Sequence, residues 1–180
     1  LEKNISYPLG DDRFHLDHGR DYFAFFRRLG EIHCYLAHKG DEILGLGQGI
    51  LRAMPDGKKA WYLCDLKVTP EARGKKITYQ LFKKAFLKCY LKCSRGYGVT
   101  MDPPTGDNPI VKLSAKLPWT PLKVSDQLAF FTLTYDQMMF YSPLLKIHRG
   151  EFGYLSHKER KDIILHSTQK PMNLWHLQWG

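Results

Sequence analysis

Three kinds of segment are missing from this 180-residue sequence, and each absence excludes a class of protein. No apolar run approaches the roughly 20 residues of a membrane-spanning helix, so we expect no helix that crosses a bilayer. The first twelve residues mix charge, proline and glycine, unlike a secretory signal peptide, and we expect a cytoplasmic protein. The four cysteines form no Cys-x-x-Cys pair, and no histidine pair completes a zinc set. We therefore expect reduced thiols and no metal site.

What the sequence has in excess is positive charge. Its 27 lysine and arginine residues exceed its 18 acidic residues, which gives a formal net charge of +9. Such an excess favours a polyanionic partner, such as a phosphate-bearing cofactor, acidic lipid or nucleic acid, although it also serves solubility alone. The sequence shows neither a recognition helix nor the paired aromatic motif of RNA-binding domains, so we expect no nucleic-acid partner.

Hydrophobic periodicity predicts one domain that mixes helices and strands. In chain order, we expect a helix over 17–29, a β-hairpin of strands 32–37 and 43–51, a turn at 54–58, a central strand over 60–69, a helix over 77–93, a strand over 97–102 and a helix over 109–117. The strand, loop, helix and strand from 60 to 102 form one crossover unit, which favours parallel pairing of the two strands.

The last third of the chain has a weaker pattern. We predict one or two strands over 122–134, a helix that is capped at Ser156 and continues through 163–165, and a terminal strand over 174–179. The predicted division is a core over 1–136 and an extension over 137–180 that packs on the same domain.

The most informative segment is a short basic loop between the central strand and the long helix. It consists of Arg73, Gly74, Lys75, Lys76, Ile77 and Thr78. A loop that leads into a helix N-terminus presents unpaired backbone N–H groups and the positive end of the helix dipole, and both attract phosphate. Gly74 permits a tight backbone path, and Thr78 adds a hydroxyl in the first turn. The alternative is an ordinary turn with solvated lysines.

The residues around this loop resemble the acyl-CoA-binding segment of the GNAT superfamily of N-acetyltransferases. The segment Val68–Leu81 has the pattern V-x-P-x-x-R-G-x-x-I-x-x-x-L and follows a hairpin and a hydrophobic strand. Arg73 matches the family's first position and Ile77 its spacer, whereas Lys76 and Thr78 stand where the family has small residues. Over about two thirds of the chain, the resemblance implies an α+β fold. Its central sheet would be mixed and mostly antiparallel, with splayed parallel strands and flanking helices.

The resemblance also implies acetyl-CoA as co-substrate and an amine-bearing small molecule or peptide as acceptor. By likeness, the groups that would bind the co-substrate are the backbone of Leu66, Lys67 and Val68 for the pantetheine arm, the amides of Arg73, Gly74, Lys75, Lys76, Ile77 and Thr78 for the pyrophosphate, and Asn108 near the thiol. The sequence leaves the oligomeric state open, with a homodimer as one option.

The catalytic residues are less well defined than this loop. Family members commonly carry a base on the central strand that removes a proton from the acceptor amine. By alternation, Asp65 and Lys67 lie on one face of this strand, and the other face carries Tyr62, Cys64 and Leu66. Cys64 stands where a glutamate is common. Asp65, turned inward by a β-bulge, is then the candidate base, with Tyr62 as a further catalytic candidate; the alternative is that Asp65 is a carboxylate paired with a nearby lysine.

The family's usual general acid, a tyrosine on the second helix, is missing. Ser114 or Ala115 stands in its place. Ser114, or a tyrosine of the extension such as Tyr141 or Tyr154, would then protonate the thiolate. The missing tyrosine motivates an alternative function, a non-catalytic protein of this fold that binds acyl-CoA or a partner.

Overall fold

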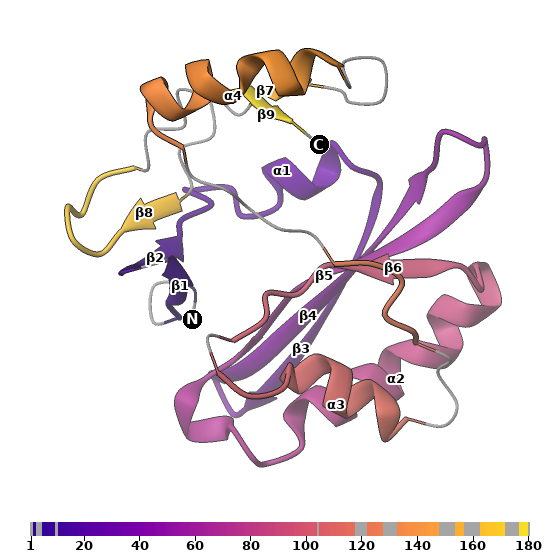
Figure 1. The fold of residues 1–180 in the computed structure, drawn as a ribbon. Coiled ribbons are helices and arrows are strands. Elements are labelled where there is room, and N and C mark those ends of the chain that lie inside the picture. Colours follow the sequence, from indigo (N-terminus) through magenta and orange to yellow (C-terminus); the bar gives the residue numbers. More distant parts are fainter. Residues whose placement is uncertain are drawn as a thin grey trace.

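A four-stranded sheet with strand order β3-β4-β5-β6 lies at the centre of the chain (Figure 1). Its strands are β3 (Glu31–Lys39), β4 (Glu42–Ala53), β5 (Lys59–Val68) and β6 (Gly96–Gly98). β3, β4 and β5 run antiparallel to one another, and β6 pairs with β5 in parallel. The predicted hairpin, central strand and mostly antiparallel mixed sheet are thus confirmed.

The computed structural model describes residues 2, 5–9, 11–103, 105–117, 122–127, 133–147, 154–156, 163–171 and 177–179. Within these ranges, no helix is both long and apolar enough to cross a bilayer.

One face of the central sheet is covered by the long helix α2 (Ile77–Lys92), which follows the short 3-10 helix η2 (Pro70–Ala72). The helix lies close to β4 because that strand presents glycines to it. A Cβ atom on Gly45 would lie 3.0 Å from Cγ2 of Ile77. Trp61 of β5 anchors the far end of the helix, since its indole N–H donates to the carbonyl of Cys89 at 2.9 Å. The apolar cluster between helix and sheet contains Ala72, Ile77 and Leu81, with Tyr35, Ala37, Leu44, Leu66 and Val68 packed against it.

The opposite face of the sheet carries the short helix α1 (Ala24–Arg27), above the sheet in Figure 1. The remaining elements are β1 (Tyr7–Leu9) and β2 (Asp12–Leu16), α3 (Pro109–Ala115), α4 (Tyr135–Ile147), β7 (Tyr154–Ser156), β8 (Ile163–Leu165) and β9 (Leu177–Trp179). A small sheet with order β1-β2-β8 joins the start of the chain to residues 163–165, and β7 pairs with β9. Part of the predicted extension therefore pairs with the N-terminal segment.

The predicted helix over 17–29 is wrong for most of its length, because only α1 is helical there. The Asp17 carboxylate accepts from the N–H of Gly19 at 2.8 Å, and the Asp21 carboxylate accepts from the N–H of Phe23 at 3.2 Å. Such local side-chain bonds compete with the helical backbone pattern. The apolar spacing was therefore misleading, although Phe26 does pack into the interior.

Three predictions in the later half of the chain are also corrected. The strand over 97–102 is reduced to β6, and the side chains that follow β6, Val99 and Met101, face solvent. Residues 122–127 and 133–134 contain no strand, and the remaining part of that prediction, 128–132, lies outside the described residues. Residues 163–165 form β8 instead of a helix, because they pair with β2.

Two predicted helices are confirmed, with small changes at their ends. α2 ends at Lys92 and α3 at Ala115. The helix expected after Ser156 is not found where residues are described, since this residue ends β7. The terminal strand is present as β9, while 172–176 lie outside the described residues. Helix α4, which contains Pro143, was not predicted.

Candidate functional site

The strands β5 and β6 pair over only three residues and then part. The last pair in register is Leu63 with Gly98, whereas β4 stays paired with β5 as far as Val68. Among the described residues, no strand pairs with the β6 side of β5 beyond Leu63. This edge of β5 can therefore accept an extended ligand as an added half-strand.

The loop at the end of this edge carries backbone N–H groups that the described part of the chain does not use. The N–H groups of Arg73 and Lys75 donate to η2, to the carbonyls of Pro70 and Ala72, each at 3.2 Å. The other four N–H groups of the loop, those of Gly74, Lys76, Ile77 and Thr78, have no hydrogen-bond partner within the part of the chain that the structure describes. They stand at the N-terminus of α2, where the helix dipole favours an anion.

Two residues with left-handed backbone conformation shape this loop. Gly74 has φ +79° and Lys76, the N-cap of α2, has φ +58°. A Cβ atom added at Gly74 would meet no atom within 4 Å, so the space next to its backbone is open. The loop thus combines open space, N–H groups that no described residue binds, and three basic side chains, which are features that phosphate binding needs. That a diphosphate binds there remains a prediction.

A β-bulge lies in β5 at the candidate base. Asp65 has φ +52°, a conformation that aspartate tolerates better than most residues, and the register between β4 and β5 shifts between Leu46 and Gln48. The bulge changes which side chains share a face. Cys64 and Lys67 lie on the α1 side of the sheet, whereas Leu66 packs against the α2 cluster. The predicted grouping of Cys64 with Leu66 is therefore wrong.

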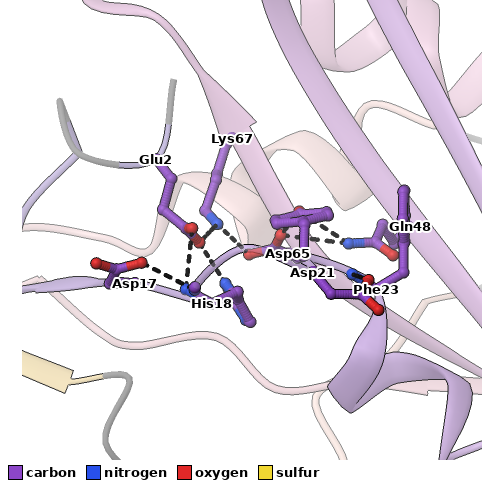
Figure 2. A network of polar contacts seen from close by, with 10 residues as sticks. Glu2, Asp17, His18, Asp21, Phe23, Gln48, Asp65 and Lys67 are labelled. Carbon is purple, nitrogen blue, oxygen red and sulfur yellow. Dashed lines mark hydrogen bonds and ion pairs between the residues drawn. The ribbon is translucent and has the colours of Figure 1, made fainter.

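The bulge places Asp65 in a buried polar network (Figure 2). One carboxylate oxygen contacts the Lys67 ammonium at 2.6 Å; the other accepts from the Tyr22 hydroxyl and from the Gln48 amide, the latter at 3.3 Å. Gln48 also donates to the Tyr22 oxygen at 2.9 Å. Lys67, only 2% exposed, contacts the Glu2 carboxylate at 2.9 Å. The structure thus pairs Asp65 with a lysine, which is the alternative that the sequence left open.

The protonation states in the network follow from burial and from these bonds. Burial alone would lower the pKa of the Lys67 ammonium, but its hydrogen bonds to Asp65 and Glu2 outweigh that effect and raise the pKa. Burial, together with the bond to Asp65, raises the pKa of the Tyr22 hydroxyl. Burial also raises the pKa of the Cys64 thiol to about 12. At neutral pH Lys67 is therefore charged, whereas Tyr22 and Cys64 are protonated and neutral.

The other predicted site residues lie apart from this network. Tyr62 stacks on Tyr97 with ring centroids 5.2 Å apart. The Ser114 hydroxyl donates to the carbonyl of Val111, one turn earlier in α3, at 2.7 Å. Tyr141 is exposed on α4.

Asn108 is engaged as the N-cap of α3. Its side-chain oxygen accepts from the N–H of Ile110 at 2.9 Å, and its amide donates to the carbonyl of Met101 at 3.2 Å and to the Asp102 carboxylate at 2.9 Å. Asn108 therefore caps α3, whereas its role near a thiol remains a prediction.

Sequence reasoning did not place Tyr22, Gln48 or Glu2 in a polar network. Gln48 is the one polar residue between Ile43 and Leu51 of β4, and it is buried. A buried polar residue needs a polar partner, but nothing in the sequence identifies that partner. Glu2 is brought to Lys67 only by the folded N-terminal segment.

No protein family model matches the sequence. An uncharacterized protein of Acanthamoeba polyphaga mimivirus is 34% identical over 91 residues, which cover 46% of this chain and 27% of that protein. The matching part thus spans about a quarter of that relative.

Among solved structures, a candidate acetyl transferase from Pyrococcus furiosus is similar with a TM-score of 0.50 and 21% identity, over 62% of this chain and 72% of that one. An aminoglycoside N-acetyltransferase solved in complex with CoA is similar with a TM-score of 0.44 and 14% identity, over 61% of this chain and 81% of that one. The likeness to the Pyrococcus protein confirms the predicted fold class: this chain has the fold of the GNAT N-acetyltransferases.

Proposed function

We propose that the protein transfers an acetyl group from acetyl-CoA to a primary amine of an acceptor. The observation that carries this proposal is the set of four N–H groups at the N-terminus of α2 that no described residue binds. They lie next to the edge of β5 that no described strand covers where β5 parts from β6. Phosphate groups and an extended arm joined in one molecule suit these two adjacent features.

Each part of the co-substrate has residues that would hold it. The amides of Gly74, Lys76, Ile77 and Thr78 would bind the pyrophosphate, and the open edge of β5 from Leu66 to Val68 would bind the pantetheine arm. When bound, acetyl-CoA supplies a thioester: the amine nitrogen bonds to the carbonyl carbon, the carbon–sulfur bond breaks, the sulfur takes one proton, and the second ammonium proton leaves to solvent.

Asp65 is the group that we propose binds the ammonium of the acceptor and removes a proton from it. An amine attacks only after it loses a proton, and the network holds a carboxylate, a neutral tyrosine hydroxyl and an ammonium close to β5. Because Asp65 already accepts bonds from Tyr22, Gln48 and Lys67, it would serve as a base by exchanging one of these donors for the acceptor.

Titration calorimetry with acetyl-CoA tests the loop, and the chain offers a matched control. Gly74 and Gly57 have nearly equal left-handed conformations, φ +79° and +75°, and open space at Cβ, but Gly57 lies in the turn between β4 and β5. Gly74→Asp places a negative charge beside the phosphate site and should weaken binding at least about tenfold. Gly57→Asp introduces the same strain and should leave affinity unchanged. Equal affinity in both variants and the parent would remove the loop from the site.

The second candidate function is acyl-CoA binding without catalysis. It is favoured by the Ser114 hydroxyl, which is bonded within its own helix, and by the engaged oxygens of Asp65. Release of free thiol from acetyl-CoA with a panel of amines distinguishes the two functions. Asp65→Asn, whose side chain also tolerates a positive φ, should lower release at least about a hundredfold if Asp65 is the base. Binding with no amine-dependent release would establish the non-catalytic function.

A further inference from the structure

The acceptor side of β5 contains a set of donors that converge on one carboxylate, and that carboxylate belongs to Glu2. The Lys67 ammonium contacts Oε1 of Glu2 at 2.9 Å, and Nδ1 of His18 contacts the same oxygen. The backbone N–H of His18 donates to Oε2 at 3.2 Å. Both oxygens of the Glu2 carboxylate are thus bound, and the groups that bind them come from two separate segments, β5 and the loop that contains His18 (Figure 2).

These donors are buried, and Glu2 is the outermost member. The side chains of Lys67 and His18 are 1% and 6% exposed, whereas that of Glu2 is 19% exposed. Withdrawal of the Glu2 side chain would therefore open the donors to solvent without moving β5. It would also leave the buried Lys67 ammonium with Asp65 as its remaining carboxylate partner among the described residues. The carboxylate of a ligand should therefore bind in the place of the Glu2 carboxylate.

Lys67 also fixes where an amine next to such a carboxylate would lie. Its ammonium touches Glu2 at 2.9 Å on one side and Asp65 at 2.6 Å on the other. A ligand carboxylate in the place of that of Glu2 is therefore a close neighbour of the Asp65 carboxylate. In an α-amino acid, a single carbon joins the ammonium to the carboxylate. When the carboxylate binds at Lys67, the ammonium can therefore reach the neighbouring Asp65 carboxylate.

We infer that Lys67 and His18 form a carboxylate-binding subsite that Glu2 fills from within the chain, and that the acceptor is an α-amino acid whose carboxylate displaces Glu2. This inference rests on the proposed function for its reaction: the amine beside Asp65 would take the acetyl group. Glu2 then acts as an internal competitor, which closes the site until the acceptor arrives.

The test measures binding of glycine and of glycinamide, which lacks the charged carboxylate, by chemical-shift titration without acetyl-CoA. In Glu2→Ala, glycine should bind at least about tenfold more tightly than in the parent protein and at least about tenfold more tightly than glycinamide. Adding Lys67→Met to Glu2→Ala should abolish the preference for glycine. Glu42→Ala, at an exposed glutamate that begins β4, is the matched control and should behave as the parent.

Equal binding of glycine and glycinamide in Glu2→Ala, or no gain over the parent, would overturn the inference. Circular dichroism checks the fold of each variant; if the alanine variant is not native, Glu2→Gln removes the charge with little change in shape, and the same two outcomes decide. Because no acetyl-CoA is present, failure here leaves the proposed transferase activity standing, and failure of acetyl-CoA binding leaves this titration valid.

Discussion

Lys67 offers the sharpest test of the buried network, because methionine matches its length and lacks its charge. In Lys67→Met the carboxylates of Asp65 and Glu2, which contact Nζ at 2.6 and 2.9 Å, lose their shared counterion. Removing one partner of a buried ion pair costs about 3–5 kcal/mol, since the remaining charge stays desolvated. Lys67 is 2% exposed, so solvent screens little of this loss. A loss of about 3 kcal/mol would lower Tm by roughly 6–12 °C in a chain of this size.

Urea denaturation at pH 7 measures the loss, and Lys112→Met is the control. The ion pair of Lys112 with Asp107 is exposed, so its removal should cost at most about 0.5 kcal/mol. Adding Asp65→Asn should restore part of the stability at pH 7. A loss below about 1 kcal/mol would refute the buried, paired state of Lys67.

Three further predictions concern other parts of the fold. In Gly45→Ala, the new methyl would lie 2.9 Å from the carbonyl oxygen of Lys67, so we expect a loss of about 1–3 kcal/mol in denaturant unfolding. Hydrogen bonds to Lys92 and His33 lower the pKa of Glu31 from 4.5 to about 2. The contribution of Glu31 to the free energy of unfolding is therefore present above pH 4.5 and is lost as the pH falls toward 2. In Glu31→Gln, the free energy of unfolding should vary less with pH between 2 and 4.5. Asn108→Ala removes the cap of α3 and should cost about 1–2 kcal/mol, while a parallel loss of acetyl-CoA affinity, measured by calorimetry, would assign this residue to the cofactor site as well.

The middle of the chain was predictable because its signals are local. The hairpin, β5, α2 and the start of α3 each carry their own periodicity and turn residues, and the loop Arg73–Thr78 is contiguous. The ends of the chain were not predictable, because β8 forms a strand through its pairing with β2, which lies far away in the sequence. A capping pattern and a few apolar residues cannot show that two segments from opposite ends of the chain will meet.

The polar network was harder to predict than the loop, because its members come from separate segments. Tyr22 precedes α1, Gln48 lies in β4, and Glu2 precedes β1. No spacing in the sequence relates these three residues to Asp65. Asp65 and Lys67 could therefore be named from their positions on one strand, while Tyr22, Gln48 and Glu2 could not. Burial of polar residues is the remaining signal, and it becomes visible only in the folded chain.

The bulge itself, however, does have a signature in the sequence. The side chains of β5 that face α2 are Trp61 and Leu63 and then Leu66 and Val68, so a repeat of two residues contains one step of three. If Asp65 continued the regular strand instead of forming a bulge, strict alternation would direct the Lys67 ammonium into the apolar cluster under α2 and Leu66 toward the polar face. The burial of charge in an apolar cluster costs more than one strained residue, and aspartate is among the residues that adopt a positive φ most readily. The same inserted residue thus keeps the apolar face continuous and gathers Asp65 and Lys67 on the opposite face, where the proposed acceptor would bind.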